Sequence, residues 1–208
     1  YDSMSQYPTH ISSPEYKKYI TQQRDVEAKE SDYKWSAGDT IRTAIGQSYN
    51  NYTSALMSKY VATLANGGTR YSMHFLNKIT TNDGKIEEEY QPKVESKIEI
   101  KKENLDAIFR GMFLVTTGPR GTLRSYFKDF PVNVAAKSGT AQQSSKRSEH
   151  TTFVAFAPLE DPQISVCVII PFGNGTTGPA PKVAKAAISE YLKLDYESEL
   201  KSYDTLLH

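Results

Sequence analysis

The segment from residue 132 to residue 193 constrains the fold most strongly, because three short apolar runs are followed there by a helical pattern. Pro158 and Pro162 mark a tight reversal between the second and third runs, which predicts that these two strands are antiparallel. Pro179 and Pro181 suit the first turn of a closing helix. The predicted strands span residues 132–140, 151–157 and 163–171, and the predicted helix spans residues 181–193.

Two earlier segments, 54–65 and 102–116, have apolar residues at helical spacing and are predicted to be helices. Asn51 or Thr53 is suited to cap the first of them, and Asn66-Gly67-Gly68 to end it. We interpret the apolar stripe of the second helix as core. It consists of Leu105, Ile108, Phe109, Met112 and Phe113.

Between these helices the sequence predicts a hairpin. Asn82-Asp83-Gly84 is a strong turn signal, flanked by predicted arms at residues 71–80 and 85–90. The acidic run from Glu87 to Glu89 is interpreted as a solvated face.

The element pattern predicts a mixed α+β fold with an antiparallel sheet packed with helices. Residues 1–36 are polar and are expected to form an irregular lead-in with one short helix around 14–28. Residues 37–195 would form the core of a single domain and residues 196–208 a tail.

The net charge and the cysteine content exclude few classes of function. Twenty-five basic and 24 acidic residues give no electrostatic argument for nucleic acid as a partner. The single cysteine, Cys167, lies in an apolar run and is expected to be a buried small hydrophobe. No apolar run approaches the roughly 20 residues of a membrane-spanning helix. An export signal or anchor, if one exists, is expected upstream of Tyr1.

The most informative site candidate is the end of the first apolar run, where Lys137, Ser138, Gly139 and Thr140 follow one another. A strand edge with this amine and these hydroxyls can hold a substrate carboxylate, and its backbone N–H groups can stabilise an oxyanion. Gly139 leaves room for a ligand to lie against the strand. The alternative interpretation is an ordinary exposed turn.

The glycine pattern at residues 173–178 and the histidines are interpreted mainly as structural. Residues 173–178 match a dinucleotide-binding glycine pattern, but too little chain follows to close a βαβ unit, so we expect a glycine-rich turn. His150 is expected to cap a loop, or alternatively to line the cleft. None of the histidines (His10, His74, His150 and His208) has a partner at metal-ligand spacing, so no metal is expected, although a zinc site involving Asp2 and His10 stays an alternative.

Three segments taken together resemble class B penicillin-binding proteins, the cell-wall D,D-transpeptidases, over about residues 35–195. Their order and spacing both agree with that family, whose third active-site motif is Lys-Ser/Thr-Gly. The segments are Gly38-Asp39-Thr40 with Ile45-Gly46-Gln47 and Ala65 to Gly68; Gly121-Thr122; and Lys137 to Gln142 with Phe153 to Pro158.

The chain departs from the family in one respect. The family's nucleophile lies in a Ser-x-x-Lys motif that, with a Ser-x-Asn motif, precedes Gly38-Asp39-Thr40. Ser48-Tyr49-Asn50 follows that position, and none of the three Ser-x-x-Lys strings, which begin at Ser31, Ser125 and Ser198, has the required context. We therefore expect the C-terminal portion of a transpeptidase domain, with the nucleophile upstream and this chain inactive alone.

The resemblance implies an acyl-enzyme formed at the D-Ala-D-Ala end of peptidoglycan stem peptides and mimicked by β-lactams. It implies catalytic roles for Lys137 and Thr140, and substrate binding by Lys137, Ser138, Gly139 and Thr140. Expected partners are stem peptides, β-lactams and the N-terminal segment of the same domain. No cofactor, metal or nucleic acid is expected.

The implied location is the extracytoplasmic face of the bacterial cytoplasmic membrane, through an anchor outside this chain. Two alternatives stay open: a non-catalytic module that recognises β-lactams or cell wall, and a D,D-carboxypeptidase.

Overall fold

The chain folds into two compact units, residues 1–56 and residues 57–208. The structure, a computed structural model, describes residues 11–141, 148–173 and 178–195. The units are considered separately below, beginning with the second, which contains the predicted sheet and the Lys137–Thr140 segment.

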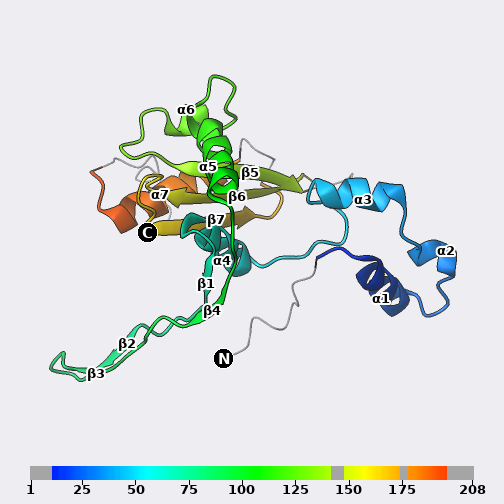
Figure 1. Cartoon of the computed structure of the whole chain (residues 1–208), viewed down its shortest axis with the longest axis horizontal. Helices are drawn as coiled ribbons and strands as arrows, with labels where there is room; N and C mark the ends of the chain where they lie inside the picture. Colours follow the sequence, from blue (N-terminus) through cyan, green and yellow to red (C-terminus); the bar gives the residue numbers. More distant parts are fainter. Residues whose placement is uncertain (1–10, 142–147, 174–177, 196–208) are drawn as a thin grey trace, which may run out of the picture. The chain divides into compact units, whose positions relative to one another are not determined.

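A three-stranded antiparallel sheet organises the second unit, in the order β5-β6-β7 (Figure 1). The predicted strands and their antiparallel reversal are confirmed, with shifts of one to three residues at their ends. The strands are β5 (Ala135–Ala141), β6 (His150–Ala157) and β7 (Ile164–Ile170). Because β6 lies in the centre, β5 and β7 are the edge strands of this sheet.

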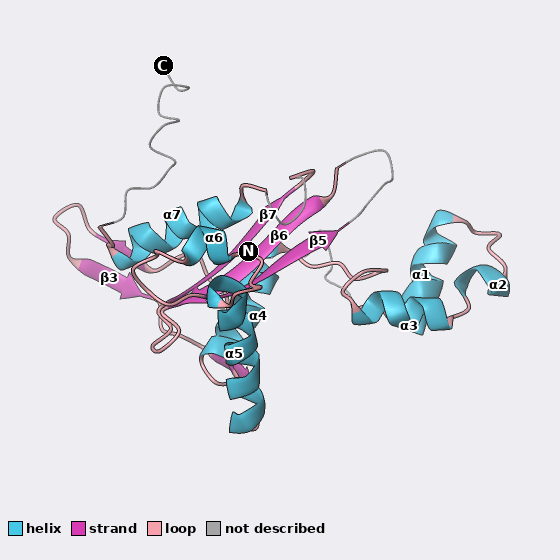
Figure 2. Cartoon of the chain, turned by 90° about the horizontal axis from the view of Figure 1, so that it is seen from above, coloured by secondary structure: helices cyan, strands magenta, loops and turns pink. Residues whose placement is uncertain are grey.

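Side-chain alternation along these strands produces two apolar layers, one on each face of the sheet. On one face α7 (Ala180–Leu192) and α6 (Arg124–Phe127) pack against the strands, and on the other α4 (Ser54–Ala65) and α5 (Lys102–Thr117) do so (Figure 2). The first layer includes Phe127, Ala136, Phe153, Ala155, Ala184 and Ile188, and the second includes Val61, Ala135, Phe109, Val154 and Phe156.

Both predicted helices of the first half are confirmed, and so are the end signals of the first, α4. The Leu56 N–H donates to the Thr53 hydroxyl at 3.2 Å, so Thr53 caps α4. Gly67 and Gly68 follow the helix at positive φ, 79° and 106°. The predicted α5 stripe is only partly core: Phe109 and Met112 pack in the second layer, whereas Ile108 is exposed.

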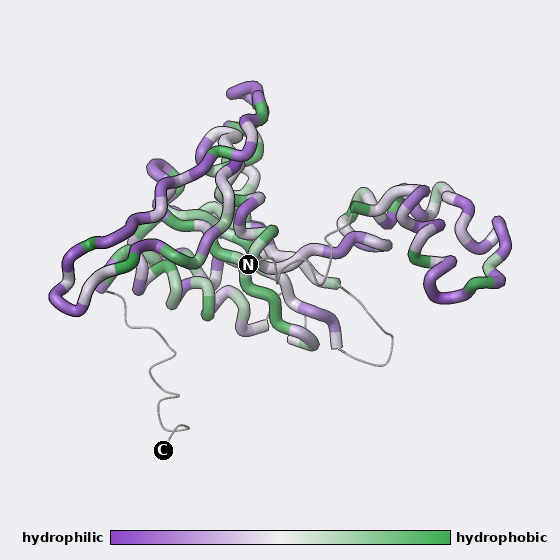
Figure 3. Tube along the Cα trace, turned by 90° about the horizontal axis from the view of Figure 1, so that it is seen from below, coloured by the Kyte–Doolittle hydropathy of each residue, from purple (hydrophilic) through white to green (hydrophobic). Residues whose placement is uncertain are grey.

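The hairpin is a ribbon in two parts, mostly hydrophilic in Figure 3. The outer part, β2 (Lys78–Thr80) with β3 (Ile86–Glu89), closes at the predicted turn, and Glu87 to Glu89 are exposed as expected. The inner part pairs β1 (Thr69–Tyr71) with β4 (Val94–Lys97), of which the predicted arms included only Tyr71. Pro92 lies in the interruption between β3 and β4, where it offers no N–H to a ladder.

A cluster of ionic contacts fixes the base of this ribbon to α4. Lys59 donates to both oxygens of Glu95 at 2.7 Å, and Arg70 Nε donates to Glu95 Oε2 at 2.7 Å. Lys59 first, and Arg70 second, lower the pKa of Glu95. The ribbon is therefore tied to the helix that precedes it rather than joined by two unrestrained chains.

The described residues of the first unit, from residue 11 onward, form three complete helices, one of them predicted. The predicted short helix is α1 (Pro14–Arg24), whose Tyr16 N–H donates to the Ser13 hydroxyl at 3.1 Å. The others are α2 (Glu30–Tyr33), inside the segment expected to be irregular, and α3 (Ala37–Ala44). Ser36 and Asp39 form a reciprocal capping box at the start of α3, so Gly38-Asp39-Thr40 is helical.

Asp39 organises this unit from a completely buried position. Its Oδ2 accepts from Lys17 Nζ at 2.9 Å and from the backbone and hydroxyl of Ser36, and its Oδ1 accepts from Arg42 at 2.9 Å. The Lys17 ammonium, and then Ser36, hold the pKa of the Asp39 carboxyl well below its usual value. Lys17 also donates to the Lys34 carbonyl at 2.8 Å, so one buried amine joins α1, α3 and the turn before α3.

Candidate active-site edge

The Lys137–Thr140 segment lies on β5, whose start is held by contacts on both sides. The buried Thr116 hydroxyl of α5 donates to the Val134 carbonyl at 2.7 Å. On the other side, the Leu159 N–H donates to the Asn133 carbonyl at 2.9 Å. These two bonds set the strand's position and the direction in which each of its backbone groups points.

Alternation along an antiparallel strand then assigns the backbone groups of β5 to its two sides. Asn133 faces the β6 side and Val134 faces away from it, so Ala136, Ser138 and Thr140 also direct their N–H and C=O groups away from β6. The Lys137 amine donates to the Ser138 carbonyl, which agrees with this assignment. No strand among the described residues pairs with this edge, and the Thr140 N–H points to that side of the strand.

Side chains alternate between the two faces of the sheet. Lys137 lies opposite Val154, on the face that carries α4 and α5, and it is exposed. Ser138 and Thr140 lie on the α7 face, where Ser138 is opposite the buried Phe153. The amine and the hydroxyls thus share an edge but not a face.

The predicted site residues also differ in how far their side chains are exposed to solvent. Ser138 is only 7% exposed, so in this conformation its hydroxyl offers little surface to a ligand carboxylate, whereas Thr140 is half-buried. Lys137 forms no ion pair with a carboxylate in the part of the chain that the structure describes. Its amine is bonded to the Ser138 carbonyl instead.

Gly139 is not required by the packing of the chain. A Cβ built at this position would meet its nearest neighbour, the Thr152 Cβ, at 3.5 Å, which is an ordinary van der Waals contact. The space beside Gly139 therefore exists without serving the chain's own packing, which suits a ligand lying against the strand.

His150 caps a loop, as expected. The Phe172 N–H donates to His150 Nδ1 at 3.2 Å, and the two rings lie 4.8 Å apart. His150 is opposite Ala141 in the register, so this contact holds the turn after β7 beside the end of the Lys137–Thr140 segment.

The other candidates have the following surroundings. Ser31 belongs to the first unit, where its hydroxyl donates to Asp32 at 3.2 Å, and Ser125 lies exposed on α6. Asn50 binds the Ser12 N–H, at 2.9 Å, and the Gln47 carbonyl, at 3.0 Å. Ser198, Asp2, His10, His208 and most of the 173–178 glycine segment lie outside the described residues.

The described residues contain no group of three or more metal-ligating side chains and no helix long and apolar enough to cross a membrane. Cys167 packs in the second apolar layer, as expected of a small hydrophobe, but it is half-buried rather than buried, and burial raises the pKa of its thiol to about 11. It is therefore protonated at neutral pH.

The sequence analysis missed the buried ion pair between Lys17 and Asp39. The two residues are 22 positions apart, so no local pattern connects them. The Ser36-x-x-Asp39 spacing was the one available signal, because it is an N-terminal capping pattern.

Comparison with known proteins gives one family. A model described as the penicillin binding protein transpeptidase domain matches residues 16–190. Penicillin-binding protein 2B of Streptococcus pneumoniae is 31% identical over 77% of this chain and 25% of its own length. Peptidoglycan D,D-transpeptidase MrdA of Escherichia coli is 32% identical over 82% of this chain and 29% of its own length.

A solved structure of PBP2 of Pseudomonas aeruginosa, in complex with WCK 5153, aligns with a TM-score of 0.68 at 31% identity. The alignment covers 91% of this chain and 39% of that chain. The 208 residues thus span about a quarter of the length of the curated relatives, and the helices and antiparallel sheet match a solved transpeptidase fold.

Proposed function

Because the chain belongs to the penicillin-binding protein transpeptidase family, we propose that it supplies the substrate-binding edge of a serine D,D-transpeptidase that cross-links peptidoglycan stem peptides. The observation that carries this proposal is the edge of β5. There an exposed Lys137, an unfilled space at Gly139 and the outward backbone of Thr140 follow one another.

In the proposed reaction a serine hydroxyl attacks the carbonyl of the D-Ala-D-Ala peptide bond, and its proton passes to the departing D-Ala amine. The acyl group then moves from the serine to an amine of a neighbouring stem peptide. Negative charge collects on the attacked oxygen in both steps, so fixed N–H donors lower both barriers. The Thr140 N–H would be one donor and the nucleophile's own N–H the other.

Lys137 would provide positive potential at the edge and assist proton transfer, and the substrate carboxylate would be held by Ser138 and Thr140. The exposure of Lys137 and the absence of a carboxylate partner among the described residues support this role. Ser138 could take part only if its side chain became more accessible than its present 7%. β-Lactams would enter the same edge as mimics of the dipeptide.

We place the nucleophile on a segment outside these 208 residues. Ser31 donates its hydroxyl to Asp32, and Ser125 lies on α6, whose Phe127 packs on the sheet face opposite Lys137. The protein would act at the extracytoplasmic face of the cytoplasmic membrane, where its substrate lies.

Labelling of the intact protein with a fluorescent penicillin, followed by mass spectrometry of the adduct, tests the proposal. We expect one serine adduct outside the 208 residues. No adduct would favour a recognition module, and an adduct inside the chain would overturn our placement of the nucleophile. Supplying a stem pentapeptide with an acceptor amine separates cross-linking from release of D-Ala to water by a carboxypeptidase.

Replacement of Lys137 tests the edge itself. Lys137→Ala should lower the acylation rate by about 100-fold or more, as other electrostatic deletions in acyl-transfer sites do. Lys97→Ala is the matched control, because Lys97 is also an exposed strand lysine but lies on the ribbon. An unchanged rate in Lys137→Ala would remove this residue from the site.

A further inference from the structure

The space beside Gly139 is bounded, among the described residues, by Thr152 of the central strand β6. A Cβ built at Gly139 would meet the Thr152 Cβ at 3.5 Å and the Thr152 carbonyl oxygen at 3.8 Å. The two residues are partners in the register of β5 and β6. Because partners across an antiparallel pair direct their side chains to the same face, Thr152 lies on the face that carries Lys137.

The Thr152 hydroxyl is not used by the chain's own hydrogen bonds. Thr152 is half-buried, and its side chain forms no hydrogen bond with a residue that the structure describes. The buried threonines Thr63 and Thr116, by contrast, donate to the backbone carbonyls of Lys59, at 2.8 Å, and Val134, at 2.7 Å. Thr152 therefore lacks the bond that gives those two threonines a structural role.

The row of the sheet that contains Thr152 is less covered within the second unit than the row next to it. Val154, two positions along β6, is 8% exposed beneath the second apolar layer. Ile169, the partner of Thr152 on β7, is 38% exposed on the same face. The apolar layer under α4 and α5 thus buries the Val154 row more completely than the Thr152 row.

Thr152 also resolves a difficulty with Ser138. Lys137 and Ser138 lie on opposite faces of the sheet, and Ser138 is 7% exposed, so these two residues cannot bind one carboxylate together in this conformation. Thr152 is the diagonal neighbour of Lys137 on the same face, a geometry in which residues lie about 7–8 Å apart, within reach of a long side chain. The Lys137 ammonium has further N–H donors besides the one that binds the Ser138 carbonyl.

We propose that Thr152 is a ligand-contacting residue that, together with Lys137, holds the terminal carboxylate of the substrate over Gly139. The inference rests on the proposed function for the identity of the ligand. The Thr152 hydroxyl would donate to one carboxylate oxygen and the Lys137 ammonium to the other, and hydrogen bonds to an ionised acceptor are stronger than neutral ones. The central strand would thereby contribute to the site, because a glycine at position 139 leaves Thr152 uncovered from the β5 side.

Two substitutions at position 152 separate the hydroxyl from the shape of the side chain. Thr152→Val keeps the shape and suits a strand, so the intact protein should fold with an unchanged melting temperature. It should react with benzylpenicillin about 10-fold more slowly or less, because a hydrogen bond to a charged group is lost. Thr152→Ser keeps the hydroxyl and should keep most of the rate.

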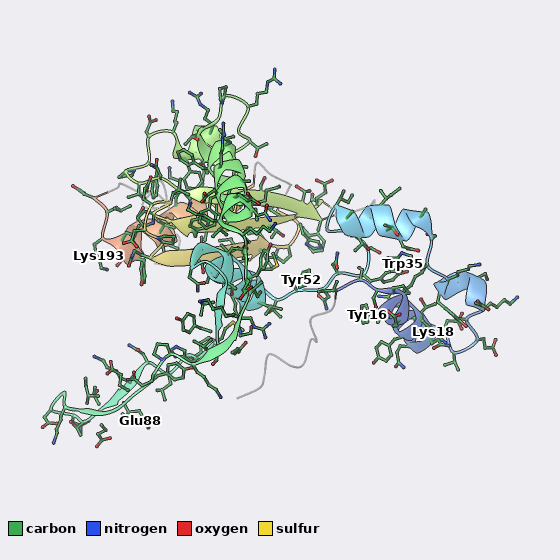
Figure 4. All side chains as sticks on the ribbon, in the orientation of Figure 1. Tyr16, Lys18, Trp35, Tyr52, Glu88 and Lys193 are labelled. Carbon is green, nitrogen blue, oxygen red and sulfur yellow. The ribbon has the colours of Figure 1, made fainter. Side chains whose placement is uncertain are left out.

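Thr80→Val is the matched control and should react normally. Thr80 is also an exposed strand threonine, but it lies on the ribbon beside Ile79, whose register partner is Glu88 (Figure 4). A normal rate in Thr152→Val, or equal losses in Thr152→Val and Thr152→Ser, would overturn the role of the hydroxyl.

The methyl ester of benzylpenicillin tests whether the carboxylate is the group that Thr152 contacts. The ester has no anionic carboxylate, so Thr152→Val should slow its reaction much less, relative to the unsubstituted protein, than it slows benzylpenicillin. Mass spectrometry of the adduct measures both ratios. Equal ratios for the acid and the ester would show that Thr152 acts only through the structure of the strand, and would overturn the proposal.

The two proposals fail in different ways. If the unsubstituted intact protein is acylated and the ratios are equal, the Thr152 inference alone is wrong. If it is not acylated, the proposed enzyme function is wrong, and saturation-transfer NMR with N-acetyl-D-alanyl-D-alanine and its C-terminal amide decides the inference. Weaker binding of the acid alone in Thr152→Val would support it, whereas equal effects on acid and amide, or no binding of either, would overturn it.

Discussion

Gly121 and Gly139 differ in whether packing within the chain requires a glycine at that position, and this difference separates a structural position from a proposed functional one. A Cβ added at Gly121 would come within 2.5 Å of the carbonyl oxygens of Leu114 and Val115, so the end of α5 requires a glycine there. At Gly139 the nearest contact would be 3.5 Å. The resemblance to the family includes both glycines, but only Gly121 is explained by packing within the chain.

Gly139→Ala should therefore leave folding intact and reduce acylation of the intact protein. The new methyl group would occupy the space proposed for the ligand, and we expect at least a 10-fold slower reaction with penicillin. Thermal unfolding of the variant should differ little from that of the parent protein. Gly121→Ala is the contrasting control, since its close contacts should lower stability by several kcal/mol. A Gly139→Ala protein with normal acylation would show that the space is not used.

Ser48 has a backbone conformation that is unfavourable for a residue with a side chain. It has a positive φ of 75°, which non-glycine residues rarely adopt, and its buried hydroxyl has no hydrogen-bond partner within the described part of the chain. Ser48→Gly should raise the free energy of unfolding of the first unit by about 1 kcal/mol, because both penalties disappear.

The nearby Gly46 provides the opposite test. Its φ is 83° and an added Cβ would meet nothing within 4 Å, so Gly46→Ala changes conformational preference without creating a clash. It should lower stability by about 1 kcal/mol. Urea unfolding followed by Trp35 fluorescence measures both variants, and a destabilised Ser48→Gly would contradict the interpretation.

Elements in this chain are joined by a few specific side-chain pairs. Ser58 on α4 and Ser165 on β7 form a reciprocal pair: their hydroxyls lie 3.0 Å apart, and each also reaches the other's carbonyl, at 3.3 and 3.2 Å. The pair fixes α4 against the edge of the sheet opposite β5. Because the two serines share their bonds, their contributions to stability should not add.

A double-mutant cycle measures this coupling. Ser58→Ala and Ser165→Ala should each lower the free energy of unfolding by about 1 kcal/mol. The double variant should lose about 0.5–1 kcal/mol less than the sum of the two. Ser54→Ala, at an exposed position on the same helix, is the control with little expected effect. Strict additivity in urea unfolding would mean that the pair does not act as a unit.

Elements with strong local signals could be predicted, and elements that depend on distant partners could not. The bounds of α4 are those predicted, because an apolar period, a Thr53 cap and two glycines agree. The helix α3 was not predicted, because its residues include Gly38, Thr40 and Thr43, which are poor helix formers, and its apolar residues face outward. Lys17 stabilises it from 22 residues away.

The candidate site could likewise be predicted only where the signal is local. The sequence predicts a strand ending in Lys137 to Thr140, and β5 confirms it. Only the strand order shows that β5 is an edge, and only the register shows that Lys137 and Ser138 lie on opposite faces. Contacts between strands, rather than the order of residues along one strand, decide which groups a ligand can reach.

At the scale of the whole molecule, acid should weaken the first unit through one buried carboxylate, that of Asp39. The single tryptophan, Trp35, lies in the first unit beside Thr40 and reports on that unit alone. The pKa of Asp39 is held well below its ordinary value by Lys17 and Ser36. Because the folded-state pKa is depressed, the resulting stability is complete above about pH 5 and is lost as the pH falls through the folded-state pKa.

We therefore expect the urea midpoint of Trp35 fluorescence to be level from pH 7 to about pH 5 and to fall below about pH 4. Asp39→Asn should lower the midpoint at pH 7, because the Lys17 ammonium keeps its burial but loses its counter-charge, and should flatten the acid limb. An acid limb of equal size in Asp39→Asn would assign it to other carboxylates.

The position of β5 at the edge of its sheet has a second consequence, for the behaviour of the protein in concentrated solution. An edge strand with which no described strand pairs can add the same strand of another molecule, and such edges seed aggregates. A charged lysine in the middle of the edge opposes that stacking by repulsion between copies. Lys137 would then preserve solubility as well as serve the reaction, and preparations lacking its charge should be handled dilute.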